Sequence, residues 1–161
     1  MKSLHKKSLI TLIISIALPL LAGFIGSLFT TPSIPTWYAG LLKPALNPPS
    51  WIFGPVWTTL FICMGVALFL VLSDDIRKKN VKIALGFSVF QLGLNVLWSY
   101  LFFGIHNPGL AFVDIVCLWL SILATLVLFS KISKTAAWLL VPYLAWVSFA
   151  SYLNYMIWTL N

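Results

Sequence analysis

Two side-chain amides in the third apolar stretch of the sequence are the first groups that could recognise a ligand. Gln91 and Asn95 are four residues apart, so on a helix they share one face. Trp98 and Phe102 continue that face over the next two turns. Aromatic rings stack on a flat ligand and amides orient its polar edge. Amides also join neighbouring membrane helices by hydrogen bonds, so packing is an equally good interpretation.

The last apolar stretch predicts a second stripe. Its members follow one another at four-residue spacing, namely Trp138, Pro142, Trp146, Ala150 and Asn154. On a helix such residues share one face, and the proline is expected to bend it. Ordinary helix packing explains a stripe of this kind more often than ligand binding does.

Groups for conventional acid–base chemistry are scarce. The chain has three acidic residues, and it lacks a nucleophile elbow, a P-loop and an HExxH motif. Asp114 follows Pro108 by six residues and is either a cap of the fourth helix or an acceptor in a pocket. His106 falls in a loop and could ligate a haem iron, but it has no paired ligand. We expect no metal site and no required cofactor.

The elements that carry these residues must be membrane helices. The 161-residue chain is 61% hydrophobic and only 8% charged, whereas soluble domains are about 25% charged. Five continuous apolar runs are long enough to span a bilayer, and continuous runs exclude a β-barrel. The spans run approximately over residues 9–29, 51–72, 81–103, 109–129 and 135–160. We therefore predict an all-α membrane protein, a single domain over residues 1–161, with five transmembrane helices.

The connections between the spans differ in length and charge. The first, residues 30–50, is long and contains five prolines, which is typical of a functional loop. Nine Lys and Arg residues fall in the N-terminal tail and in the second and fourth connections, against Lys43 alone in the first. By the positive-inside rule the N-terminus is cytoplasmic and the C-terminus is outside. Positive charge confined to these connections indicates orientation rather than nucleic-acid binding.

Three blocks of sequence resemble the TspO/MBR family, the tryptophan-rich sensory proteins and translocator proteins, also called peripheral benzodiazepine receptors. The first block contains WYxxLxKPxxxPP from Trp37, followed by FGPxW from Phe53. The second is QLxLNxxWSxLFF from Gln91, and the third is PYLxWxxFAxxLN from Pro142. No Lys or Arg follows Lys134, so the cholesterol pattern associated with eukaryotic relatives is missing. The resemblance is therefore to a bacterial member, in a plasma membrane.

This resemblance implies a five-helix bundle whose cavity, covered by the first loop, binds porphyrins and isoquinoline or benzodiazepine-type ligands. The implied ligand is protoporphyrin IX or haem, and a homodimer is implied as well. By matching position, the resemblance assigns these residues to the pocket: Tyr38, Pro48, Phe53, Trp57, Phe61, Gln91, Asn95, Trp98, Trp146, Ala150, Leu153 and Asn154.

Three functions are compatible with these features. The first is a membrane receptor or carrier for porphyrin-type tetrapyrroles, linked to tetrapyrrole or stress regulation. The second is light- and oxygen-dependent porphyrin degradation, in which the resemblance makes Trp57 and Trp146 the redox partners. The third is a regulatory scaffold that binds a partner through its basic second connection, although such charge usually only sets topology.

Overall fold

Five long α-helices make up the protein. The computed structural model describes residues 2–74 and 76–161, with side chains from residue 9 onward. The helices are α1 (Lys2–Ser33), α2 (Phe53–Leu72), α3 (Lys79–Ser99), α4 (Pro108–Ser130) and α5 (Lys134–Leu160). Each is long and apolar enough to cross a membrane, and no strand occurs among the described residues. The predicted five-span, all-α membrane protein is confirmed.

Three short helical turns extend the long helices at one end of the bundle. The π-helical turn η1 (Ile34–Tyr38) continues α1, the 3-10 turn η2 (Ser50–Ile52) leads into α2, and the π-helical turn η3 (Tyr100–Gly104) continues α3. The prediction of a loop over residues 30–50 is therefore wrong in its first half, because the chain stays helical to residue 40. Pro35 lies at the junction of α1 and η1, where its missing N–H removes one hydrogen bond and the helix changes to a π-helical turn.

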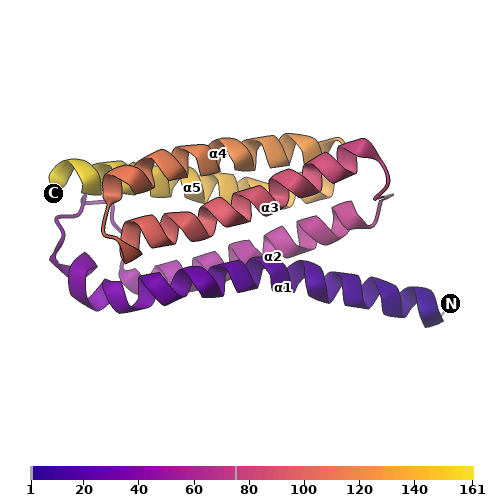
Figure 1. Cartoon of the computed structure of the whole chain (residues 1–161), viewed down its shortest axis with the longest axis horizontal. Coiled ribbons are helices and arrows are strands. Elements are labelled where there is room, and N and C mark those ends of the chain that lie inside the picture. The colour runs from indigo at the N-terminus through magenta and orange to yellow at the C-terminus, as the bar shows by residue number, and fades with distance from the viewer. Residues whose placement is uncertain (1, 75) are drawn as a thin grey trace.

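The five helices form a closed ring. Around the bundle the order is α1, α2, α5, α4, α3, and α3 returns to α1. The α1–α2 loop, the α3–α4 connection and the C-terminus lie at one end, and the N-terminus with the other two connections lies at the opposite end (Figure 1). We call the first of these the loop end and the second the basic end, because the nine clustered Lys and Arg residues lie toward it.

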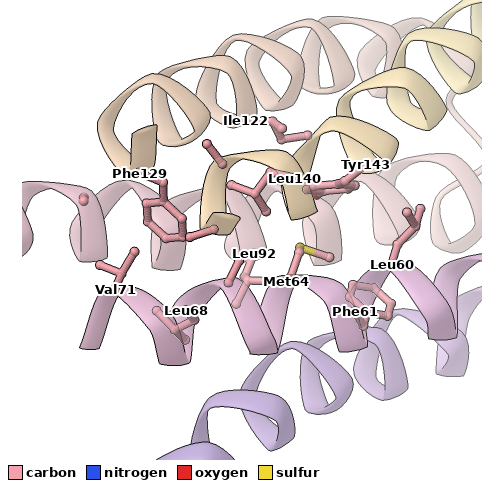
Figure 2. Close-up of a cluster of buried hydrophobic side chains, with 14 of the residues drawn as sticks. Leu60, Phe61, Met64, Leu68, Val71, Leu92, Ile122, Phe129, Leu140 and Tyr143 are labelled. Atoms are coloured by element: carbon pink, nitrogen blue, oxygen red, sulfur yellow. The ribbon is translucent and has the colours of Figure 1, made fainter. Parts of the chain in front are cut away.

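The main hydrophobic core fills the middle and the basic half of this ring. Figure 2 shows Met64 and Leu68 of α2 facing Leu92 of α3, with Ile122 and Leu140 contributed by α4 and α5. A second, aromatic cluster at the loop end joins η1 to η3 and contains Tyr38, Phe102, Phe103, Ala111 and Ile157. The open space of the bundle lies between these two clusters.

Small residues let α1 approach its two neighbours closely. A Cβ atom at Gly65 of α2 would lie 2.5 Å from the Cα atom of Ile16, and one at Gly26 would lie 2.9 Å from Oγ of Ser99 in α3. Close backbone approach is the usual means of packing helices where hydrophobic burial gives no advantage over lipid. The position of α1, and with it one wall of the bundle's interior, therefore depends on these glycines.

Candidate functional site

A cavity of about 550 Å³ occupies the half of the bundle nearer the loop end. This volume is within the range of roughly 300–1,000 Å³ that is usual for small-molecule sites. Its walls come from α1, η1, η2, α2, α3, η3 and α5, and the described residues of α4 do not line it. The aromatic residues of the lining are Phe24, Tyr38, Trp51, Phe53, Trp57, Phe61, Trp98, Phe102, Phe103 and Trp146.

Ten of the twelve residues predicted for the pocket line this cavity together. They are Tyr38, Phe53, Trp57, Phe61, Asn95, Trp98, Trp146, Ala150, Leu153 and Asn154. The other two, Pro48 and Gln91, are not in the lining. The structure thus brings most of the predicted set around one space, while their binding of a ligand stays a prediction.

Aromatic pairs give the cavity rigid, flat walls. Trp57 stacks on Phe61 with ring centroids 5.5 Å apart, and Trp98 stacks on Phe102 at 5.1 Å. Trp146 meets Phe53 edge to face at 6.1 Å, which links α5 to α2. Rings held by other rings have few alternative positions, so the faces they present to the cavity are fixed before a ligand arrives.

A buried polar network forms the floor of the cavity. The hydroxyl of Tyr143 donates to Oε1 of Gln91 at 2.8 Å and accepts from Nδ2 of Asn95 at 3.2 Å. Nε2 of Gln91 lies 3.6 Å from the sulfur of Met64. Gln91 is one turn deeper than Asn95, and its oxygen and nitrogen both have protein partners, so these bonds hold it away from the cavity. Oδ1 of Asn95 accepts no hydrogen bond from the described residues and is available to a ligand.

Asn154 joins three helices at the wall of the cavity. Its Oδ1 accepts from the indole N–H of Trp98 at 2.9 Å, and its Nδ2 donates to the carbonyl of Pro108 at 2.7 Å. These bonds tie α5 to α3 and to the start of α4. The packing interpretation of the amides therefore accounts for most of what Asn154 and Gln91 do, whereas Asn95 serves both the network and the lining.

Contacts between the end of α1, the two π-helical turns, the α3–α4 connection and the α1–α2 loop hold the loop end together. Ser33 donates to the carbonyl of Phe103 at 2.7 Å, and Trp37 stacks on His106 with ring centroids 4.3 Å apart. The hydroxyl of Tyr38 donates to Oδ1 of Asn47 at 2.9 Å, and Nδ2 of Asn47 donates to the carbonyl of Pro48 at 3.2 Å. Pro48 thus shapes the loop behind Tyr38 and does not face the cavity.

Three other residues from the sequence analysis lie away from the cavity. Trp138 is 73% exposed near the basic end, so only the later part of the predicted α5 stripe faces the cavity. Asp114 is buried inside α4, whose N-cap is Asn107, so the interpretation of Asp114 as a helix cap is wrong. His106 contacts Trp37 and Ser33 rather than the lining.

The polar wall that α1 contributes was missed at the level of sequence. Ser27, Thr30 and Thr31 line the cavity, and Ser99 of α3, which also lines it, packs against Gly26 of α1. In the sequence, Thr30 and Thr31 follow Ser27 by three and four residues, which places all three on one helix face, and this was the available signal.

Comparison with known proteins matches almost the whole chain. The sequence model of the TspO/MBR family matches residues 15–159. The tryptophan-rich protein TspO of Chlorobaculum tepidum is 49% identical over 155 residues, covering 96% of this chain and 98% of that protein. A protein of the same name from Archaeoglobus fulgidus is 44% identical over 154 residues, covering 96% and 99%. The human translocator protein is 42% identical over 145 residues, covering 89% and 85%.

Proposed function

We propose, since this chain belongs to the TspO/MBR family of membrane proteins, that its cavity binds porphyrin-type tetrapyrroles, so that the protein acts as their membrane receptor or carrier. The observation that carries the proposal is the pair of stacked aromatic walls around an uncharged space of about 550 Å³. Isoquinoline and benzodiazepine-type ligands, which are also flat and aromatic, would occupy the same space.

The chemistry of the lining supports a flat, largely apolar ligand with a polar centre. Indole and phenyl faces stack on an extended π-system, which contributes about 0.5–1.5 kcal/mol per pair beyond the burial of area. Oδ1 of Asn95 offers an acceptor to a ligand N–H, and the buried indole N–H of Trp146 has no acceptor among the described residues. Both groups would be satisfied by a ligand that carries donors and acceptors inside an aromatic frame.

Titration of protoporphyrin IX into the purified protein tests this proposal. We expect Trp146→Ala and Asn95→Ala to weaken binding, the tryptophan variant by about tenfold or more. Trp138→Ala is the matched control, because Trp138 is exposed and remote from the cavity. The same affinity in all four proteins would contradict binding in this cavity.

Further parts of the proposal concern the setting in the cell. Nine basic residues toward one end against one at the other support a cytoplasmic N-terminus in a bacterial plasma membrane, with the loop end and the C-terminus outside. The cavity would then lie in the outer half of the bilayer. The homodimer implied by the resemblance stays a prediction.

Photochemical degradation of the bound porphyrin is a second candidate function. Trp57 and Trp146 project from α2 and α5 into the lining of one cavity, as a pair of redox partners for a bound porphyrin would require. Dioxygen would be the oxidant under illumination, and the porphyrin would be oxidised. The test compares the absorbance of illuminated protein and porphyrin in air with that of free porphyrin, and with Trp57→Phe and Trp146→Phe. No new pigment beyond the free-porphyrin control would rule this function out.

A further inference from the structure

The cavity contains no group that could balance the charge of an acidic ligand. The polar residues of its lining are hydroxyl and amide side chains and the indole N–H groups, and none of the described lining residues is charged. Burying an unpaired carboxylate in such surroundings is strongly unfavourable. A ligand that carries carboxylates must therefore direct them out of the cavity, where water or a basic side chain can meet them.

Among the described basic side chains, Lys43 lies nearest to the lining of the cavity. It lies in the α1–α2 loop at the loop end, while the other Lys and Arg residues precede the first apolar run or lie near the connections of the basic end. Its ammonium nitrogen is 4.7 Å from the ring centroid of Tyr38, and that ring lines the cavity. One aromatic side chain therefore separates the cavity from a positive charge.

The position of Lys43 is fixed by the loop before any ligand binds. Its ammonium group donates to the carbonyls of Ala39 at 3.3 Å and Leu41 at 3.0 Å. Asn161 holds the adjacent backbone, since it accepts from the N–H of Leu42 at 3.0 Å and donates to the carbonyl of Leu42 at 3.1 Å. An ammonium group has three donors, so one donor of Lys43 remains for a further acceptor.

No carboxylate of the described residues forms an ion pair with Lys43. Asp74 pairs with Lys78 at the basic end at 2.8 Å, and Asp114 is buried within α4. Among the described residues, the partners of the half-buried Lys43 ammonium group are two carbonyls and a ring. Such a group gains most from an anionic acceptor, because charge-assisted hydrogen bonds are the stronger ones.

We propose that Lys43 binds a carboxylate of the ligand beside the Tyr38 ring at the loop end, so that the protein prefers acidic tetrapyrroles over their neutral esters. This inference rests on the proposed function and adds the group that selects among porphyrins. The macrocycle would lie between the aromatic walls, and an acidic side arm would pass Tyr38 to reach the ammonium group.

Lys43 also stabilises the end of the helical segment that η1 continues, through its bonds to two carbonyls. If this structural role is the only one, removing the charge should weaken the binding of every ligand by the same factor. The proposed role predicts a loss confined to ligands that carry a carboxylate. A comparison of two ligands with the same macrocycle therefore separates the two roles.

The experiment measures the affinity of the full chain for protoporphyrin IX and for its dimethyl ester, in nanodiscs of the neutral lipid phosphatidylcholine. We expect the wild-type protein to prefer the acid, and Lys43→Gln to lose about threefold to tenfold in affinity for the acid alone. Lys43→Arg should keep the preference. Lys131→Gln, an exposed lysine at the basic end, is the control and should behave as wild type.

Each outcome bears on one of the two proposals. Equal acid-to-ester ratios in Lys43→Gln and the wild type, or equal losses for both ligands, would overturn the role of Lys43 and leave porphyrin binding standing. Failure of the wild-type protein to bind either porphyrin would overturn the proposed function, and the role of Lys43 with it.

Discussion

Tyr143 connects the cavity floor to the packed interior through a single hydroxyl group. The side chain is fully buried, and its hydroxyl bonds to both Gln91 and Asn95. In water such bonds exchange with solvent, but inside a membrane bundle a lost partner is not replaced. The orientation of Asn95, the amide that reaches the cavity, therefore depends on a residue that does not line the cavity.

Tyr143→Phe tests this dependence. The variant keeps the ring and leaves Oε1 of Gln91 and Nδ2 of Asn95 without their partner, so the free energy of unfolding should fall by about 1 kcal/mol. Porphyrin affinity should fall as well, because Asn95 loses its fixed orientation. Thermal unfolding in detergent and porphyrin titration measure the two effects. Tyr152→Phe is the control, since Tyr152 is 41% exposed, and an equal loss in both variants would contradict the argument.

Residue types and spacing predicted which helix face each site residue lies on better than they predicted whether its side chain reaches the cavity. The four-residue spacing of Gln91 and Asn95 correctly placed them on one side of α3, but only Asn95 lines the cavity. The bonds from Tyr143 and Met64 that hold Gln91 come from other helices. Contacts between helices far apart in sequence leave no periodic signal in either helix, so depth could not be predicted from spacing.

At the scale of elements, the crossing of α1 and α2 sets the width of the cavity. Both helices contribute to its lining, and Gly65 lies where α2 meets the backbone of α1 at Ser15 and Ile16. A methyl group at Gly65 would lie 2.5 Å from the Cα atom of Ile16 and 2.9 Å from the carbonyl oxygen of Ser15. Because backbone atoms cannot turn away as side chains do, one of the two helices must move.

We therefore expect Gly65→Ala to push α1 away from α2. The free energy of unfolding should decrease by about 1–3 kcal/mol, as for other overpacked sites, and affinity for a cavity ligand should decrease with it. Gly93→Ala in α3 is the matched control, because nothing lies within 4 Å of its added Cβ atom. Unfolding temperatures of the two variants in the same detergent give the comparison, and unchanged stability in Gly65→Ala would refute the close approach.

The ends of the helices were predictable wherever polar residues interrupt the apolar runs. The predicted spans 109–129 and 135–160 agree with the helices Pro108–Ser130 and Lys134–Leu160 to within one residue at each end. The first span was predicted to end at residue 29, yet the helix continues past Pro32 and Pro35 through a π-helical turn. That turn is held by packing on η3, including the bond from Ser33 to Phe103, which is a tertiary contact invisible to local propensity.

At the scale of the whole molecule, charge and cavity are separated along the bundle axis. The lysines and arginines counted toward the basic end are three in the N-terminal tail, four around the α2–α3 connection and two around the α4–α5 connection, which makes nine. The cavity lies in the other half, beside Lys43 alone. Because the nine basic residues at one end determine the orientation, the single charge of Lys43 at the other end can serve ligand recognition.

Reporter fusions test the orientation that this separation predicts. An alkaline phosphatase, which is active only outside the cytoplasm, should be active when fused after residue 161 and inactive when fused after Lys131. Green fluorescent protein at the same two positions should give the reverse pattern. The reason is that moving the basic end across the membrane would translocate nine positive charges to retain one, which the positive-inside rule disfavours. Phosphatase activity after Lys131 together with none after residue 161 would invert the orientation and place the cavity and Lys43 toward the cytoplasmic side. Lys43→Gln should leave both fusion patterns unchanged, because one charge against nine does not decide the topology, and this separates the role of Lys43 in recognition from any role in insertion.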